Sequence, residues 1–267
     1  MIFKKGDNFF FNKLSKHINK SDTIYLELDI MRFGKHLKNN ISKESYLNFF
    51  FKLFTRLVGK KGNIIIPSFS YSWGFDKKNK IFDCNFTKPA TGIFPEYFKK
   101  QKDVVRTKDP MFSCLVYGKN RNFFLNNPGK NSFGVDSIYG KIYQTKAKLV
   151  SFGLNKFDPT FVHYVEQYYD KNIRKIKYRK LKKFKGFIVD SKGNKYKDHQ
   201  FCFMKPKGSK ISYNEKNIRY ILQKKKMLQR IKIFDTDIFI CNSKDFFENG
   251  LIGLKSNRNF FIKNQKN

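Results

Sequence analysis

Residues 42–67 read SKESYLNFFFKLFTRLVGKKGNIIIP, and this stretch decides the expected fold. Apolar side chains recur at helical spacing through residues 42–57, which predicts an amphipathic helix with one buried face. Gly59 and Gly62 close the helix, because glycine readily takes the backbone conformations that end one. Residues 63–67 then form a short apolar strand that Pro67 ends. A helix that leads directly into a buried strand indicates an α/β sheet.

The flanking segments extend this pattern. Residues 22–28 alternate in polarity and predict a strand before the helix. Further strands are expected at 114–117, 148–153 and 235–241, with a hairpin at 187–203 that turns at 190–193. Further helices are expected at 8–19, 92–101, 158–169, 211–232 and 244–250. We therefore predict an α/β fold with a central mixed sheet flanked by helices. Residues 1–267 are expected to form a single domain, in which 171–210 are a small β-rich lobe of the C-terminal third.

The composition limits the class of protein. The 267 residues carry a formal net charge of +35, and only nine of the 56 basic residues are arginine. A bias toward AT-rich codons explains such an excess of lysine over arginine, and the lysines would then form a solvated surface. The alternative is a positive field that attracts anionic ligands such as CoA or sugar nucleotides. No stretch is long and apolar enough for a membrane span, and residues 1–13 do not resemble a signal peptide. The four cysteines lack metal-ligand spacing, so we expect no metal site and a reduced, cytoplasmic location.

Residues 158–166, DPTFVHYVE, carry the main chemical signal. Asp158 is expected to cap a helix that Pro159 begins. His163 and Glu166 then share one helical face near the N-terminus, whose partial positive charge favours a neutral imidazole suited to a general base. Glu166 opposes this effect and can fix the tautomer of the ring. The alternative is a structural His–Glu pair, because H-x-x-E alone is a weak pattern.

Shorter motifs follow the chain in a fixed order. They are GNIIIPSFS at 62–70, TGIFPEYF at 91–98, VRTKDPMFS at 105–113, SFGVDS at 132–137 and VSFG at 150–153. With residues 158–166, their order and spacing resemble the aminoglycoside 3-N-acetyltransferase family over roughly residues 21–170, and more loosely beyond. The resemblance implies a single acyltransferase domain that transfers an acyl group from acyl-CoA to an amine, with acetyl-CoA as the expected cosubstrate.

The resemblance also implies roles for individual residues. His163 matches the catalytic histidine that deprotonates the attacking amine, and Glu166 matches its acidic partner. Thr160 matches the threonine before the histidine, and its hydroxyl is expected to meet a carbonyl oxygen. The positions that match the family's CoA-side motifs are Ser68, Ser70, Arg106, Thr107 and Ser113.

The chain departs from the family at several of these motifs. Residues 27–30 read Glu-Leu-Asp-Ile where the family has His-Ser-Ser-Leu, so part of the CoA contact is replaced. Lys35 and His36 are expected to substitute for it by charge. Asp109 takes the place of the histidine before a proline, and Ser137 is followed by isoleucine rather than proline. The chain is therefore a diverged member.

The expected reaction is direct attack of the amine on the acyl-CoA thioester, because no motif positions a cysteine as a nucleophile. With 21 acidic against 56 basic residues, the long-range field disfavours a polycationic acceptor. We therefore expect the amine of an amino sugar, nucleotide-linked and destined for surface polysaccharide. One alternative is an aminoglycoside 3-N-acetyltransferase that confers antibiotic resistance. An alternative of another class is a basic nucleic-acid-binding module, for which the lysine-rich residues 173–185 are the best feature; we expect no nucleic-acid partner. The sequence leaves open whether the chain forms a homo-oligomer.

Overall fold

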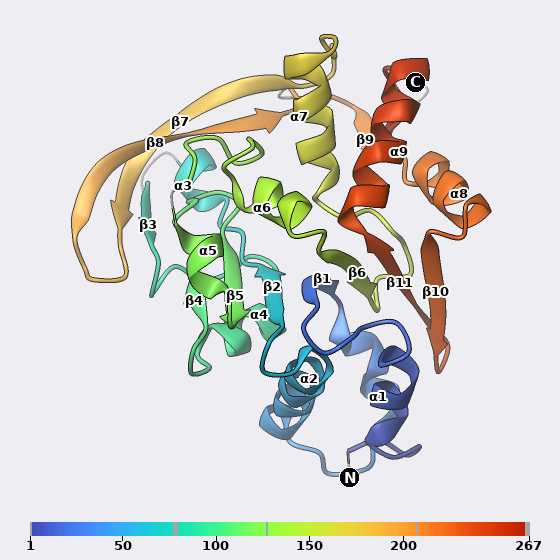
Figure 1. Cartoon of the computed structure of the whole chain (residues 1–267). Coiled ribbons are helices and arrows are strands. Elements are labelled where there is room, and N and C mark those ends of the chain that lie inside the picture. Colours follow the sequence, from blue (N-terminus) through green and yellow to red (C-terminus); the bar gives the residue numbers. More distant parts are fainter. Residues whose placement is uncertain (1, 77–79, 127, 207, 265–267) are drawn as a thin grey trace.

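The central sheet lies at the middle of the molecule. The computed structural model describes residues 2–76, 80–126, 128–206 and 208–264. Its strands here are β1 (Thr23–Leu28), β2 (Asn63–Pro67), β4 (Val105–Arg106), β5 (Cys114–Gly118), β6 (Lys148–Phe152), β10 (Leu228–Ile233) and β11 (Thr236–Asn242). They are ordered β10-β11-β6-β1-β2-β5-β4 (Figure 1). β1 pairs in parallel with β2 and β6, whereas the outer pairs are antiparallel. The predicted mixed sheet is confirmed.

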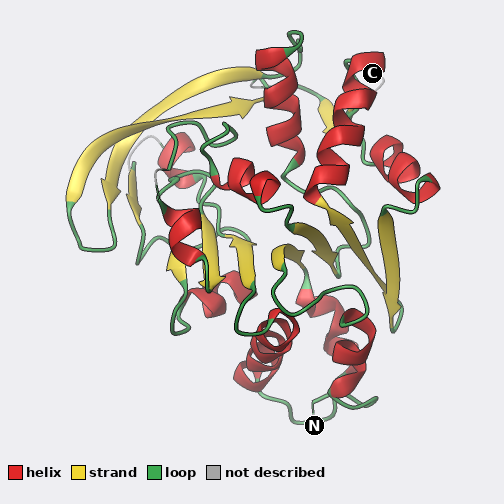
Figure 2. Cartoon of the chain, viewed as in Figure 1, coloured by secondary structure: helices red, strands yellow, loops and turns green. Residues whose placement is uncertain are grey.

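Helices cover both faces of this sheet (Figure 2). One face carries α1 (Asn8–Leu14), the 3₁₀ helix η1 (Ile30–His36), α2 (Lys43–Val58) and α4 (Ile93–Lys99). The other carries α6 (Ile138–Gln144), α7 (Val162–Asn172), α8 (Lys216–Lys224) and α9 (Ser243–Ser256). Of two short helices, α3 (Ser72–Phe75) lies near the ribbon described below, and α5 (Arg121–Leu125) lies near β5. Successive side chains of β1 point to opposite faces of the sheet, so Ile24 and Leu26 pack in one hydrophobic core and Tyr25 packs in the other.

The helix that the sequence predicts most clearly forms as expected. The hydroxyl of Ser42 accepts a hydrogen bond from the backbone N–H of Ser45 and caps α2. Its buried face has the predicted helical spacing, and Phe50 is fully buried. Gly59, with φ of 62°, ends the helix. α2 therefore delivers the chain to β2, whose five residues are all buried.

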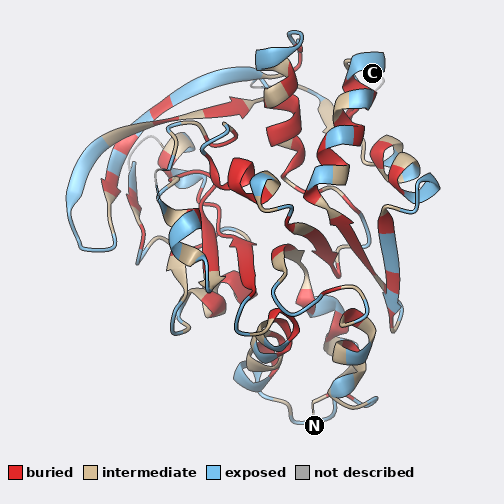
Figure 3. Ribbon diagram, viewed as in Figure 1, coloured by how far each residue is buried: buried red, intermediate tan, exposed pale blue. Residues whose placement is uncertain are grey.

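A two-stranded ribbon arches over one end of the sheet. It consists of β7 (Lys180–Val189) and β8 (Lys195–Met204), and β3 (Ile81–Asp83) extends it in parallel with β7. The predicted turn forms at residues 190–193, where the N–H of Gly193 donates to the carbonyl of Asp190. The hairpin is longer than predicted, because its first strand already begins at Lys180, within the lysine-rich residues 173–185. Its outward residues are exposed (Figure 3).

The predicted helix over residues 211–232 is wrong. This stretch contains β9 (Ile211–Tyr213), α8 and β10, and β9 pairs with β12 (Ile262–Asn264). Lys226 takes a left-handed φ of 58° between α8 and β10, so the helix cannot continue there. Among the described residues, no helix has the length and apolar character that a membrane crossing requires.

Candidate active site

Two clefts meet beside the first turn of α7. The first, here the strand-end cleft, has a volume of about 340 Å³ and is lined by the last residues of β1 and β2 and by Lys156. The second, here the His163 cleft, has a volume of about 560 Å³ and lies between the start of α7 and the end of the ribbon where β7 begins and β8 finishes. Tyr71, Asp158 and Thr160 line both clefts. Two ligands, one in each cleft, would meet at these side chains.

His163 belongs to a chain of polar side chains that leads into the protein. Its Nδ1 lies 2.8 Å from Oε2 of Glu166, and Nε of Arg179 lies 2.7 Å from the same oxygen. The Glu166 side chain is 0% exposed, whereas that of His163 is 20% exposed. Because a carboxylate only accepts hydrogen bonds, Nδ1 carries the proton and Nε2 of the neutral ring can accept one. The predicted His163–Glu166 contact thus exists, and Arg179 completes it.

The surroundings of His163 keep its ring neutral. Burial lowers the pKa of His163 most, and the positive charges of Arg179 and Lys205 lower it further, while the hydrogen bond and charge of Glu166 oppose them. Burial alone would raise the pKa of Glu166, but Arg179 and the bond from His163 outweigh it and lower that pKa. Glu166 is therefore an anion with two partners, and His163 can act as a base near neutral pH.

The helix that carries His163 begins later than predicted. Its first residue is Val162, and no side chain caps it. Asp158, the predicted cap, precedes the N-cap position by three residues, and its carboxylate lies 2.6 Å from Lys156 instead. The chain enters the helix through a backbone turn, in which the N–H of His163 donates to the carbonyl of Thr160. The predicted cap is wrong, yet His163 lies in the first helical turn, where the partial positive charge is strongest.

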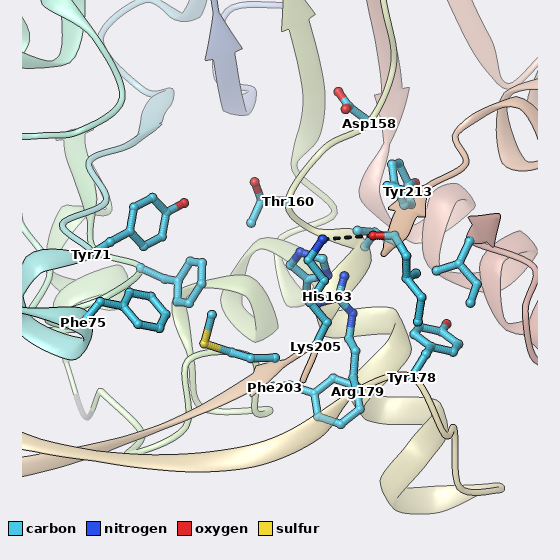
Figure 4. Close-up of a pocket in the computed structure, with 15 residues that line it drawn as sticks. Tyr71, Phe75, Asp158, Thr160, His163, Tyr178, Arg179, Phe203, Lys205 and Tyr213 are labelled. Atoms are coloured by element: carbon cyan, nitrogen blue, oxygen red, sulfur yellow. Dashed lines mark hydrogen bonds between the residues drawn. The ribbon is translucent and has the colours of Figure 1, made fainter. Parts of the chain in front are cut away.

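The walls of the His163 cleft are largely aromatic. Tyr71 and Phe75 lie across the cleft from Arg179 and Lys205 (Figure 4). The hydroxyl of Tyr213 is buried and has no hydrogen-bond partner among the described residues. Burial raises the pKa of Tyr213, so this hydroxyl stays protonated and can donate to a ligand. The aromatic lining residues are Tyr71, Phe75, Phe112, Tyr178, Phe203 and Tyr213.

Five residues predicted to contact CoA are buried in a network behind the strand ends. Arg106 donates to the carbonyl of Ser68 and, over 3.1 Å, to the hydroxyl of Ser113. Ser70 and Thr107 bond to neighbouring backbone groups. All five are at most 6% exposed, and none lines either of the two clefts. In this structure they brace the loops beyond β2, and their contact with CoA stays a prediction.

Lys35 also lies away from both clefts. Its Nζ forms an ion pair with Asp235, and Nε2 of His36 lies 3.0 Å from the other oxygen of that carboxylate. By contrast, Glu27 lines the strand-end cleft at the motif where the sequence departs from its relatives. The departure therefore places a carboxyl group in the cleft itself.

Arg179 and Lys205 were not predicted from the sequence. Arg179 directly precedes β7 and Lys205 directly follows β8 at the same end of the ribbon, where the lysine-rich composition suggests solvent-exposed charge. A signal did exist for Arg179, because arginine is scarce in this chain and the guanidinium group suits buried ion pairs. Nothing local distinguishes Lys205 from the other lysines.

A histidine–carboxylate pair beside two adjoining clefts on a mixed α/β sheet is the arrangement expected of a two-substrate transferase. The model of the aminoglycoside 3-N-acetyltransferase family matches residues 41–251, and the chain belongs to that family. No curated protein matches the sequence at a significant level.

Solved structures of the same fold include three well-covered matches. AAC-IIIb in binary complex with CoASH has a TM-score of 0.74 at 13% identity, over 94% of this chain and 96% of that chain. YokD from Bacillus subtilis has a TM-score of 0.75 at 16% identity, over 94% of both chains. Sisomicin-bound AAC-VIa has a TM-score of 0.74 at 13% identity, over 94% of this chain and 98% of that chain. At these identities the likeness concerns the fold.

The predicted family, α/β fold and enzyme class are confirmed. The chain is a CoA-dependent N-acetyltransferase with acetyl-CoA as its cosubstrate, and it acts on a small-molecule amine. The nucleic-acid alternative predicted basic and aromatic side chains on one face without an organised pocket. The family and the two clefts that converge near His163 favour the enzyme instead.

Proposed function

We propose that His163 is the general base that removes a proton from the acceptor amine. The observation that carries this proposal is its position: His163 lines one cleft next to Thr160, which the two clefts share, and its Nδ1 is bonded to Glu166. Glu166 holds the ring in one tautomer, and Arg179 keeps Glu166 ionised. We propose further that this machinery lies in one domain, whose β-rich lobe at 171–210 supplies Arg179 and Lys205. The turnover of folded His163→Ala protein tests the assignment.

The strand-end cleft suits the cosubstrate. Leu26, Leu28, Ile66 and Pro67 give it apolar walls that fit an extended pantetheine arm. Acetyl-CoA supplies an activated acyl group. We propose that the acyl end reaches the junction of the two clefts, because the reaction requires the acyl carbon to lie beside the amine.

His163 and Thr160 then have different roles in the reaction. As the amine nitrogen bonds to the acyl carbon, Nε2 of His163 takes the amine proton, and the thioester C–S bond breaks. The imidazolium returns this proton to the departing thiolate, so no net proton stays on the enzyme. Thr160 lines both clefts, and its hydroxyl is our candidate donor to the acyl oxygen as negative charge develops there.

The charges of the His163 cleft favour an anionic acceptor. Its basic lining residues are Arg179 and Lys205, and its acidic one is Asp158. Glu166 neutralises Arg179 and Lys156 neutralises Asp158. Lys205 donates to the carbonyl of Ile211 over 2.9 Å and has no carboxylate partner among the described residues. Aromatic walls add flat surfaces for a sugar or a base. We therefore propose a nucleotide-linked amino sugar as the acceptor, with surface polysaccharide as the use of its product.

The acceptor is tested with matched lysine variants. Lys205→Gln removes the cleft cation, and Lys183→Gln removes an exposed cation of the ribbon and equally changes the net charge. Free-thiol release is measured with a nucleotide-linked amino sugar and with a kanamycin-like acceptor. We expect Lys205→Gln to raise KM for the anionic sugar about tenfold or more, the equivalent of a charge-assisted hydrogen bond, while Lys183→Gln changes it little. Equal effects of the two variants would contradict recognition within the cleft.

The second candidate acceptor is an aminoglycoside. Asp158 favours it, because this carboxylate lines both clefts and the ammonium group of the acceptor would replace Lys156 as its partner. The family name points the same way. Efficient turnover of the kanamycin-like acceptor, without turnover of the nucleotide sugar, would decide for this candidate.

A further inference from the structure

Glu27 stands at the carboxyl end of β1 and contacts both the turn before α7 and the side chain of Tyr25 on its own strand. Its Oε1 accepts a hydrogen bond of 2.9 Å from the backbone N–H of Thr160 and one of 2.8 Å from the hydroxyl of Tyr25. One oxygen thus joins β1 to the turn before α7. This residue belongs to the motif in which the chain differs most clearly from its relatives.

The first contact leads to His163 through the backbone. The N–H of Thr160 points to Glu27, and the carbonyl of Thr160 accepts a hydrogen bond of 3.1 Å from the N–H of His163. The turn therefore has one end fixed by β1 and the other by the helix. Loss of the Glu27 acceptor would leave an unpaired N–H and free the residue that begins the turn.

The second contact leads to the imidazole through aromatic rings. The hydroxyls of Tyr25 and Tyr139 lie 3.4 Å apart, and both residues are fully buried. The ring of Tyr139 lies 5.0 Å from that of Phe133, between centroids. Phe133 in turn meets the His163 ring edge to face, at 5.2 Å and 78°. Both contacts of Glu27 thus end at the same catalytic side chain.

We propose that Glu27 is a positioning residue for the transfer reaction. By accepting from Thr160 and Tyr25 together, it fixes both the turn that carries His163 and the ring that packs against its imidazole. This inference rests on the proposed role of His163 as the base. A base must lie within hydrogen-bond reach of the amine, and a displacement of about 1 Å can cost about 100-fold in rate.

Three variants test the proposal. Glu27→Ala removes the acceptor, Glu27→Gln keeps an acceptor oxygen without the charge, and Asp83→Ala is the matched control. Asp83 also accepts two hydrogen bonds with one oxygen, from the N–H groups of Asn85 and Phe86, and it lines neither of the two clefts. We expect Glu27→Ala to lower kcat about 10- to 100-fold with little change in KM for acetyl-CoA. Glu27→Gln should restore most of kcat, and Asp83→Ala should keep it.

Two results would overturn the proposal. One is wild-type kcat in folded Glu27→Ala protein, and the other is an equal loss in Glu27→Gln, which would show that charge rather than hydrogen bonding matters. If Glu27→Ala does not fold, Tyr25→Phe replaces it as the test. That variant removes one donor, and it should lower kcat about two- to tenfold, equivalent to one ordinary hydrogen bond. Wild-type kcat in Tyr25→Phe would then overturn the proposal.

A double variant separates this inference from the role of His163. If Glu27 acts through His163, adding Glu27→Ala to His163→Ala should lower the residual kcat no further, since residues that act as one unit are not additive. Full additivity would overturn the positioning role and leave the base assignment intact. Wild-type turnover in His163→Ala alone would overturn the base assignment itself.

Discussion

Replacing Arg179 with methionine removes one of the two partners of a buried carboxylate. Glu166 is 0% exposed, and Arg179 lies 2.7 Å from its Oε2 with only 12% of its side chain exposed. Methionine keeps much of the side-chain volume but carries no charge. The change therefore tests whether Arg179 supports the site as the structure indicates.

The expected loss of stability follows from the burial of this pair. Removing one partner of a buried ion pair costs about 3–5 kcal/mol. His163 still donates to Glu166 in the variant, so we expect the lower end, about 3 kcal/mol. For a chain of this size, each kcal/mol shifts Tm by about 2–4 °C, which predicts a decrease of about 6–12 °C.

The same substitution should change the pH dependence of the reaction. The charge of Arg179 lowers the pKa of His163, because a nearby cation disfavours the imidazolium. Without that charge the pKa of His163 rises, and the acid side of the kcat/KM profile should move to higher pH. Calorimetry and thiol-release assays across pH measure the two effects.

An exposed ion pair provides the control. Arg230 lies 2.6 Å from Asp237, but 59% of its side chain is exposed. Arg230→Met should therefore change the free energy of unfolding little and leave the pH profile unchanged. A wild-type Tm together with an unchanged acid limb in Arg179→Met would refute the reasoning.

Three further predictions concern the base, the acid response and the backbone. His163→Ala should leave calorimetric binding of acetyl-CoA nearly unchanged and lower kcat about 10²–10⁴-fold, so near-wild-type turnover in the folded variant would refute the base. The lowered pKa of His163 means that the unfolded chain binds more protons, so the free energy of unfolding should decline as pH falls from 6.5 toward the folded pKa. Urea titrations across this range should show a smaller decline in His163→Gln. In Gly153→Ala, the new Cβ would lie 2.3 Å from the Asp29 carbonyl oxygen, at a backbone φ of +78°. Urea titration should show a free energy of unfolding about 1–3 kcal/mol lower than that of the wild type. An unchanged free energy of unfolding would show that the backbone shifts to relieve this contact.

The sequence predicted those parts of the molecule that depend on local spacing. β2 is apolar throughout and ends at a proline, so its bounds could be read directly. His163 and Glu166 are three residues apart, and a helix places such residues on one face wherever it starts. Their contact was therefore predictable even though the expected cap at Asp158 was wrong.

The remaining parts depend on contacts between distant segments. Arg179 reaches Glu166 only after the chain has left α7 and returned toward it, and a basic run otherwise indicates solvent. The end of α8 lacked a signal for a different reason. Lys226 takes the left-handed conformation that glycine usually marks, so the sequence pattern runs on into β10 without a visible break.

The residues proposed for acceptor recognition and those proposed for catalysis lie on different elements, which matters for the evolution of new activities. Lys205 follows β8 and Phe203 lies within it, whereas His163 and Glu166 belong to α7. Natural or laboratory recombination of residues 180–205 would therefore exchange Phe203, Met204 and Lys205 of the cleft wall as a single cassette and leave the helix in place. The cassette would have to keep Gly186, because a Cβ there would lie 2.5 Å from the indole nitrogen of Trp73.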